Sequence, residues 1–313
     1  MIDQVLPPAQ APVVSAAIFK AYDIRGIVET ALTEEAVSAI GLALGAKARA
    51  RGIGQVVVGR DGRLSGPALA RALSAGLCAA GVDVIDIGMV PTPLVYFATV
   101  LTGCGTGVAV TGSHNPPEYN GLKMMLGGAT LHGEDIRDIA ATLADPARYA
   151  ALFAATPGTV RTLDVVPDYI ARIAGEVKLA RPLKVVVDAG NGVAGAVAPA
   201  LLRALGITDL TELYCEVDGH FPNHHPDPAH PENLRDLIRE VQARNADIGL
   251  AFDGDGDRLG VVTRNGQMIF PDRQLMLYAA DVLEKNPGAT IIYDVKCTRN
   301  LAPWIRARGG EPL

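Results

Sequence analysis

The chain has 313 residues, which is enough for about two or three domains that each bury a core of their own. Hydrophobic residues make up 49% and charged residues 20%, an ordinary globular composition, and the formal net charge is −6. An acidic balance without clustered Lys and Arg argues against nucleic acid as a partner. A small anion can still bind where the surface is locally basic.

The cysteines and the apolar segments indicate the compartment. Cys78, Cys104, Cys215 and Cys297 are scattered, with no CxxC, which fits reduced thiols and predicts neither a disulfide framework nor a zinc site. The N-terminal stretch MIDQVLPPAQAPVVSAAIFK lacks the basic start and apolar core of a secretory signal. No charge-free apolar run of about 18 residues predicts a membrane span. We therefore expect a cytoplasmic protein without a membrane partner.

The first distinctive segment is IFKAYDIRGIV, residues 18–28, in which Lys20, Tyr22, Asp23 and Arg25 stand between apolar residues. Two interpretations stay open. The segment is either an edge strand with a charged outer face or an anion-binding edge supplied by Tyr22 and Arg25.

A degenerate repeat organises the chain. Residues 55–88 predict a buried strand, a Gly-rich loop, an Ala/Leu helix and a second strand, and residues 184–210 follow the same order. A third copy begins at residue 290. This alternation is typical of βαβ units on a mostly parallel sheet, and the copies lie too far apart for a solenoid. We therefore expect repeated α/β domains.

Composition predicts the boundaries between these domains. Residues 144–164 lack strand signals, so we expect a linker near residues 155–162. A second break is expected near residues 263–272, with a hairpin-like turn around Asn265 and Gly266. The expected domains are therefore residues 1–160, 161–265 and 266–313. The third copy stops where its second strand should begin, so we expect the third domain to be incomplete.

The stretch TGSHNPPEYNGLKM, residues 111–124, follows the apolar run GVAV, which predicts a buried strand. Ser113 does not stand in a hydrolase elbow, and no Walker loop is present. His114 is expected to be a poor base for Ser113, because successive residues point in different directions in an extended chain. A turn without function remains possible, as does a rigid loop that holds Ser113, His114 and Lys123 near a metal for phosphoryl transfer.

Residues 220–234, HFPNHHPDPAHPENL, contain His220, His224, His225 and His230 among several prolines. The prolines favour an extended loop, and a zinc site without cysteine is not favoured. We expect a loop that lines a cleft between domains, with histidines in contact with a polar ligand.

The strongest polar cluster is AFDGDGDRLG, where Asp253, Asp255 and Asp257 alternate with glycines after an apolar strand. The three carboxylates repel one another unless a cation lies between them, and such oxygen ligands suit Mg²⁺. A calcium EF-hand is excluded, because Arg258 and Arg264 occupy its required Gly and Glu positions. A solvated acidic turn is the alternative. Arg258 either neutralises this loop or binds a phosphate beside the metal.

Four motifs, FKAYDIRG, TGSHNPPEYNGLKM, GHFPNHHPDPAHPENL and AFDGDGDRLG, occur in an order and spacing that resemble the α-D-phosphohexomutases. The branch that fits best is the bacterial phosphomannomutase/phosphoglucomutase group. The resemblance implies an α/β fold with repeated domains and mixed, mostly parallel sheets. It also implies four domains around a central cleft, of which this chain would have two, part of a third and no fourth.

The resemblance assigns roles to particular residues. It implies that Ser113 is a phosphoserine and that Ser113, Asp253, Asp255 and Asp257 hold Mg²⁺. Lys123 is the implied general acid and base. The further residues that it implies are His114 and Arg258 beside the transferring phosphate, and Tyr22, Arg25, Asn115 and Lys296 as contacts to the substrate.

The implied activity is the reversible conversion of hexose 1-phosphate and hexose 6-phosphate, with mannose or glucose as the sugar. The phosphoserine gives its phosphoryl group to the sugar, and a 1,6-bisphosphate turns round and returns its other phosphate. Glucose 1,6-bisphosphate would serve as activator and intermediate. We expect a monomer with impaired turnover, because the family's sugar-reading and phosphate-binding loops would follow Leu313. Phosphoglucosamine mutase and a non-catalytic sugar-phosphate-binding relic are the alternatives.

Overall fold

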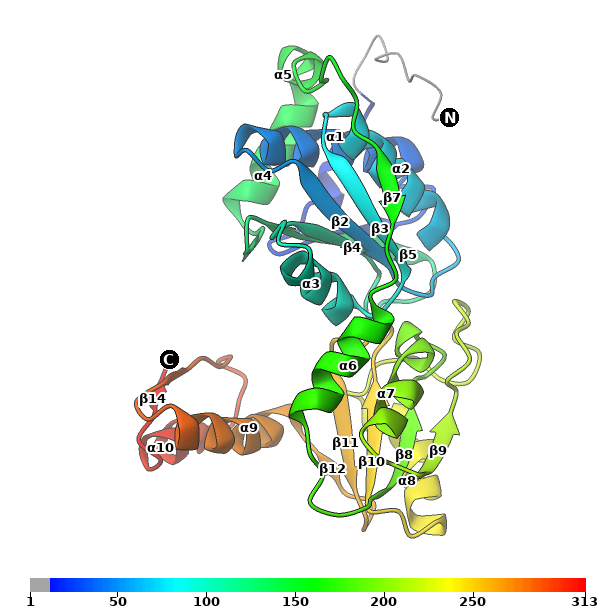
Figure 1. Ribbon diagram of the computed structural model, residues 1–313, viewed down its shortest axis with the longest axis vertical. Helices are drawn as coiled ribbons and strands as arrows, with labels where there is room; N and C mark the ends of the chain where they lie inside the picture. The colour runs from blue at the N-terminus through cyan, green and yellow to red at the C-terminus, as the bar shows by residue number, and fades with distance from the viewer. Residues whose placement is uncertain (1–11) are drawn as a thin grey trace.

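The structure is a computed structural model that describes residues 12–313. Residues 1–11 lie outside the described residues, and with them most of the stretch expected to lack a secretory signal and the start of the first expected domain. From residue 12 onward the strands form a large sheet, a second sheet and a two-stranded pair, one in each of three units along the chain (Figure 1). No helix within residues 12–313 is both long and apolar enough to cross a membrane.

The first unit is a mixed sheet in the strand order β1-β5-β4-β2-β3-β7, with β6 paired to β5. Strands β2, β3, β4 and β7 pair in parallel, whereas β5 runs antiparallel to β1 and β4. Its strands are β1 (Ile24–Ile27), β2 (Gln55–Arg60), β3 (Asp83–Met89), β4 (Gly107–Val110), β5 (Tyr119–Leu126), β6 (Ala129–Thr130) and β7 (Val160–Thr162). Its helices are η1 (Ala16–Ile18), α1 (Glu34–Ala50), α2 (Gly66–Ala79), α3 (Thr92–Leu101), α4 (Glu134–Ala144) and α5 (Pro146–Ala150).

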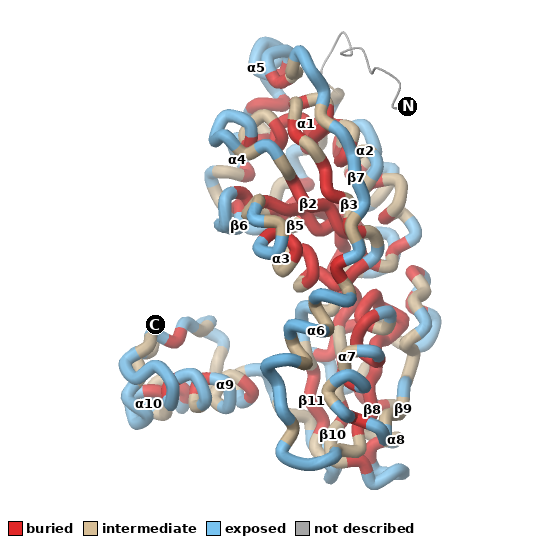
Figure 2. The backbone as a smooth tube through the Cα atoms, viewed as in Figure 1, coloured by how far each residue is buried: buried red, intermediate tan, exposed pale blue. Residues whose placement is uncertain are grey.

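Helices cover both faces of this sheet, so its central strands are apolar on both sides (Figure 2). Successive side chains of a strand point to opposite faces. In β2, Val56 and Val58 accordingly pack in the core under α1 and α2, and Val57 packs in the core under α3. The predicted order of strand, loop, helix and strand over residues 55–88 is confirmed by β2, α2 and β3.

The second unit repeats this plan with the strand order β12-β11-β10-β8-β9. Strand β8 pairs in parallel with β9 and β10, and β10, β11 and β12 pair in antiparallel. Its strands are β8 (Lys184–Asp188), β9 (Asp209–Leu213), β10 (Ile248–Phe252), β11 (Leu259–Thr263) and β12 (Met268–Ile269). Its helices are α6 (Val166–Glu176), η2 (Val193–Ala196), α7 (Ala198–Ala204), η3 (Pro231–Leu234) and α8 (Arg235–Ala243).

The third unit is small and has a correspondingly small core. It consists of α9 (Pro271–Lys285), β13 (Thr290–Ile291), α10 (Leu301–Arg306) and β14 (Glu311–Pro312). The order of strand, helix and strand from residue 290 agrees with the predicted third copy. Its buried apolar residues are Ala279, Leu283, Ile291, Leu301 and Ile305.

Two boundary expectations have different outcomes. The turn around Asn265 and Gly266 is confirmed, because the Gly266 N–H donates to the Thr263 carbonyl and Gly266 has a φ of +79°. The expectation that residues 155–162 lack a strand is wrong, because β7 pairs in parallel with β3. Strand β7 is short and exposed on both faces, so it has no apolar alternation to recognise. The division at 1–160, 161–265 and 266–313 stays a prediction, although its first boundary lies inside β7.

The first and second units contact each other through α6 (Figure 1). Tyr169 of α6 packs edge-on against Phe97 of α3, with ring centroids 5.3 Å apart. Val197 of the second unit also joins the core under α3. This contact brings together loops that follow the carboxyl ends of parallel strands in both units, a common place for ligand sites.

Candidate functional site

The loop that carries Ser113 follows the carboxyl end of β4 and meets the second unit. Ser113 is buried, and its Oγ donates a hydrogen bond to Oδ2 of Asp253 at 3.2 Å. The same Oγ lies 3.3 Å from Nδ1 of His114. The expectation that His114 is poorly placed for Ser113 is therefore wrong. Ser113 has a φ of +53°, so the chain is not extended here and neighbouring side chains can meet.

The carboxylate loop follows β10 and folds back on itself. Asp253 Oδ1 accepts the backbone N–H groups of Asp257 at 3.1 Å and Arg258 at 3.0 Å. A Cβ added to Gly254 would lie 2.4 Å from the Ser113 carbonyl oxygen. Glycine at this position therefore lets the two loops touch.

A lysine of the first unit forms ion pairs with two of the three carboxylates. Lys123 of β5 places Nζ 2.7 Å from Oδ2 of Asp255 and 2.5 Å from Oδ2 of Asp257. Burial on its own lowers the pKa of Lys123, but the two carboxylates outweigh it and the pKa is raised. Burial, followed by the charges of Asp255 and Asp257, raises the pKa of Asp253.

The carboxylate cluster has the properties of a metal site. Ligand atoms of Asp253, Asp255 and Asp257 all lie within 4.8 Å of one another. Asp253 and Asp255 are fully buried, which excludes the alternative of a solvated acidic turn. Oδ1 of Asp255 is buried and has no hydrogen-bond partner. A buried oxygen without a partner is costly, and a hard divalent cation bound by oxygens would satisfy it.

Arg25 and Asn115 lie beside the serine loop. Arg25 of the edge strand β1 donates to Oδ1 of Asn115 at 3.0 Å and pairs with Asp23 at 2.5 Å. The guanidinium therefore supports the loop, and its charge already has a partner. Tyr22 has 76% of its surface exposed. Among the described residues, no hydrogen bond or ion pair joins it to this group.

Arg258 leaves its guanidinium largely open. Its side chain is 45% exposed, and its closest carboxylates, on Asp227 and Asp253, are both 4.0 Å away. Of the two interpretations from the sequence, this geometry favours a free cationic head over one that neutralises its own loop. The charge of Arg258, after burial, is also a cause of the lowered pKa of His114.

The histidine-rich loop contacts both units, but its histidines do not converge. His225 Nε2 lies 2.5 Å from the His114 carbonyl oxygen, across the contact between the units. His224 pairs with the buried Asp188 at 3.0 Å, whereas His220 and His230 are exposed. Across residues 12–313, the group of side chains that could hold a metal is the aspartate cluster.

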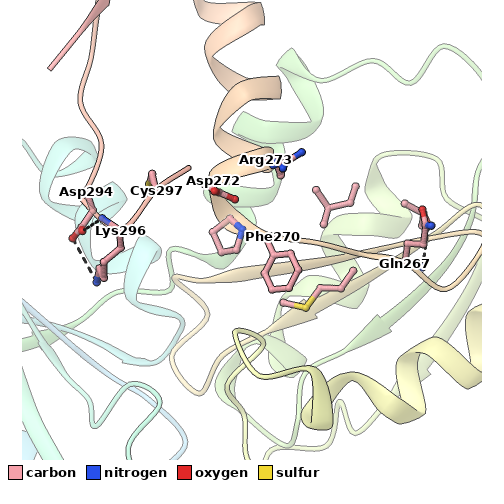
Figure 3. Close-up of a pocket in the computed structure, with 11 residues that line it drawn as sticks. Gln267, Phe270, Asp272, Arg273, Asp294, Lys296 and Cys297 are labelled. Atoms are coloured by element: carbon pink, nitrogen blue, oxygen red, sulfur yellow. Dashed lines mark hydrogen bonds and ion pairs between the residues drawn. The ribbon is translucent and has the colours of Figure 1, made fainter. Parts of the chain in front are cut away.

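Lys296 lies in a different place. It lines an open pocket of about 860 Å³ between the β11–β12 hairpin and the third unit, together with Phe270 and Asp272 (Figure 3). Its side chain is 84% exposed and lies 3.5 Å from the Asp294 carboxylate. Within the part of the chain that the structure describes, no hydrogen bond or ion pair connects Lys296 to the serine loop.

Asp61 and Arg63 were not singled out from the sequence. Both are buried directly after β2, and both bind the serine loop. The available signal was the segment VVVGRDGR, in which a charged pair follows an apolar strand. Charged residues at the carboxyl end of a buried strand are themselves buried, so their remaining donors and acceptors need hydrogen-bond partners from another segment.

Family models match most of the chain. A model described as phosphoglucomutase/phosphomannomutase, alpha/beta/alpha domain I, matches residues 16–149. The model for alpha/beta/alpha domain II of the same family matches residues 167–266. The two matches cover the units that carry the serine loop and the carboxylate loop.

Individual relatives agree with these models. The chain is 56% identical over 296 residues to a phosphoglucomutase of Neisseria gonorrhoeae, covering 95% of this chain and 64% of the relative. It is 53% identical over 305 residues to a phosphomannomutase/phosphoglucomutase of Pseudomonas aeruginosa, covering 97% and 65%. A crystal structure of a family protein from Burkholderia thailandensis superposes with a TM-score of 0.90 at 56% identity, covering 96% and 66%. The chain thus spans about 65% of the length of these relatives.

Proposed function

The chain belongs to the phosphoglucomutase/phosphomannomutase family, and from this premise we propose that it acts in the reversible conversion of hexose 1-phosphate and hexose 6-phosphate. Ser113 is the proposed phosphoryl carrier. Glucose and mannose phosphates are the proposed substrates, because the names of the two curated relatives refer to these sugars. Glucose 1,6-bisphosphate is the proposed phosphoryl donor that loads the serine.

One observation carries this proposal. Ser113 Oγ lies 3.2 Å from a carboxylate oxygen of Asp253, although the two residues come from different units. A hydroxyl next to three converging carboxylates is a poor place for an isolated anion, but it suits a phosphoryl group that shares a divalent cation with them.

Mg²⁺ is the proposed cation, held by Ser113, Asp253, Asp255 and Asp257. When bound, it supplies neutralisation of the negative charge on the transferring phosphoryl group. The half-exposed guanidinium of Arg258 is proposed to bind the same phosphoryl oxygens, since it presents several donors and its two carboxylate partners lie no closer than 4.0 Å.

The transfer itself exchanges one phosphorus–oxygen bond for another. The bond from Ser113 Oγ to phosphorus breaks, a bond from phosphorus to a sugar hydroxyl oxygen forms, and the sugar proton goes to a base while Oγ ends protonated. Lys123 is the proposed acid and base. Its ammonium, paired with Asp255 and Asp257, gives a proton to Oγ as the bond from Oγ to phosphorus breaks, and the amine that remains accepts the proton of the sugar hydroxyl. In the return half these roles reverse.

The remaining residues keep proposed roles of different kinds. His114 and Asn115 flank Ser113, and Arg25 supports the loop through Asn115. Tyr22 and Lys296 are proposed to contact the substrate, and in this structure both are exposed. A monomer is the proposed state.

The loading of Ser113 tests the proposal. We expect wild-type protein incubated with Mg²⁺ and glucose 1,6-bisphosphate to gain the mass of one phosphoryl group, and Ser113→Ala to gain none. Ser74→Ala is the matched control, because Ser74 is a buried serine whose hydroxyl donates to Ala70 within α2. Intact-mass spectrometry makes the measurement. A phosphoryl group on Ser113→Ala, or none on wild type, contradicts the proposal.

A further inference from the structure

We propose that Arg63 is the positioning residue of the serine loop: it holds the backbone around Ser113 so that Oγ faces the carboxylates of the second unit. This inference rests on the proposed role of Ser113 as phosphoryl carrier. Arg63 is 1% exposed and lies at the end of β2, between the serine loop and the second unit.

The guanidinium of Arg63 binds this loop through four of its five N–H donors. Nη2 donates to the carbonyl oxygens of Ser113 at 2.9 Å and Asn115 at 2.6 Å. Nη1 donates to those of Pro116 at 2.6 Å and Tyr119 at 2.9 Å. The remaining donor, Nε, binds the Asp61 carboxylate at 3.2 Å. All five N–H donors of the side chain therefore have an acceptor, and four of these acceptors are carbonyl oxygens of residues 113–119.

Asp61 extends the same network to the start of the loop. Its Oδ2 accepts the Thr111 hydroxyl at 2.8 Å and the Gly112 N–H at 3.2 Å. Oγ1 of Thr111 in turn accepts the N–H of Ser113 at 2.7 Å. Ser113 is thus held on both sides, with its N–H bound through Thr111 and its carbonyl bound by Arg63.

This double attachment matters because of the conformation of Ser113. Its φ of +53° is uncommon for a residue with a side chain and persists only where the surroundings impose it. That conformation turns Oγ toward both His114 and Asp253. Without Arg63, the loop would lose the contact that fixes the carbonyl side of Ser113.

Arg63 also fits its place too closely for a substitute. A Cβ on Gly112 would lie 2.4 Å from the guanidinium, so the loop lies directly against it. On its other side the guanidinium lies over the ring of Phe221, 5.3 Å from the centroid. Phe221 belongs to the histidine-rich loop of the second unit, so Arg63 contacts one loop from each unit. A lysine would keep the charge but not the planar, five-donor geometry.

The test compares Arg63→Lys with Arg49→Lys. Arg49 is a matched control, because it is a part-buried arginine of the same unit that donates to the carbonyl oxygens of Ala80 and Leu152. With glucose 1,6-bisphosphate and Mg²⁺, we expect Arg63→Lys to load Ser113 about 100-fold more slowly than wild type, as expected for a misplaced reacting group. Arg49→Lys should load Ser113 within about threefold of the wild-type rate, even where it lowers the melting temperature as much as Arg63→Lys does. Equal loading rates for folded Arg63→Lys and Arg49→Lys overturn the inference.

A second readout does not depend on the rate of loading. Mg²⁺ affinity measured by calorimetry should rise when wild type is phosphorylated, and this rise should be absent from phosphorylated Arg63→Lys.

The outcomes separate the two proposals. If wild type itself is never phosphorylated on Ser113, the proposed function fails. If wild type is phosphorylated and Arg63→Lys behaves like it, the positioning role alone fails. If Arg63→Lys does not fold, Thr111→Val provides the test. This variant removes the hydroxyl that accepts the Ser113 N–H but keeps the buried charge of Arg63. Wild-type loading by Thr111→Val then overturns the inference.

Discussion

At the scale of single residues, the site depends on negative charge that is buried without full compensation. Asp253 and Asp255 have no exposed surface, and Asp257 is exposed nearby. Lys123 provides the close positive charge, while one oxygen of Asp255 has no partner at all. Removing a carboxylate from this group should therefore change cation binding more than it changes the fold.

We expect Asp255→Asn to lower the affinity for Mg²⁺ by at least about tenfold, because loss of one of three adjacent negative charges costs more than about 1.4 kcal/mol. Isothermal titration calorimetry measures the effect. Asp281→Asn is the control, since Asp281 is an exposed carboxylate on α9 paired with Lys285. Equal affinities of the two variants would show that the cluster does not hold the ion.

At the residue level, the sequence predicted the convergence of carboxylates where like residues cluster, and their binding of a cation stays a prediction. Asp253, Asp255 and Asp257 were predicted as a group because their mutual repulsion demands a cation. Arg63 was missed because one arginine after a strand gives no such pattern, and its four carbonyl partners lie about 50 residues away along the chain. The His114 contact was missed because positive φ is unusual for serine and nothing in the local sequence demands it.

At the scale of elements, the histidine-rich loop is attached to its own sheet by a buried pair. His224 packs edge-on against Tyr214 and binds the carboxylate of Asp188, the last residue of β8. Burial lowers the pKa of His224, but the hydrogen bond and charge of Asp188 outweigh it, so the pKa is raised above its ordinary value of 6.5. Asp236, which lies farther along the chain, contributes in the same direction.

This shift fixes the sign of a pH dependence. A raised pKa in the folded state means that the pair stabilises the fold fully below the ordinary pKa and less as the pH rises through the folded value. The melting temperature of wild type should therefore exceed that of His224→Gln by more at about pH 5.5 than at about pH 8.5. His132→Gln, on the exposed surface of the first unit, should track wild type across the range. A constant difference for His224→Gln would contradict the assignment.

Element prediction was reliable where periodicity or turn chemistry was strong. Strand β4 and the β11–β12 turn were predicted from apolar runs and from Asn265–Gly266. Strand β7 was not, because three exposed residues added at a sheet edge carry no alternation. Within residues 18–28, β1 confirms an edge strand at Ile24–Ile27, and Arg25 of this strand binds Asn115 of the serine loop. The interpretation of Tyr22 and Arg25 as an anion-binding edge stays a prediction.

At the scale of the whole molecule, the site exists only where the first two units touch. Each contributes one loop, and the two loops touch at Gly254, where an added Cβ would lie 2.4 Å from the carbonyl oxygen of Ser113. The βαβ repeat predicted the units but not their contact. The two units pack together through residues such as Phe97, Tyr169 and Val197. In the sequence these are ordinary apolar residues, and no pattern around them predicts a contact between units.

Gly254→Ala should therefore act on the contact between units. We expect it to destabilise the protein by about 1–3 kcal/mol, because the added methyl group has no space between two backbones. Gly175→Ala is the control, since Gly175 is exposed on α6 with nothing within 4 Å of its added Cβ, and it should stabilise by about 0.5–1 kcal/mol. Urea unfolding of both variants measures the difference. Similar free energies of unfolding would mean that the loops are not in tight contact.

The attachment of each loop to its own unit has a consequence for biosynthesis. The serine loop is held by Asp61, Arg63 and Thr111, all made before the second unit leaves the ribosome, and the carboxylate loop is held by its own N–H groups. Domains generally fold as units, the N-terminal one first. The serine loop can thus reach its strained shape while the carboxylates are still untranslated. The contact between Ser113 and Asp253 then arises late, in a docking step that joins the folded first unit to the folded second unit.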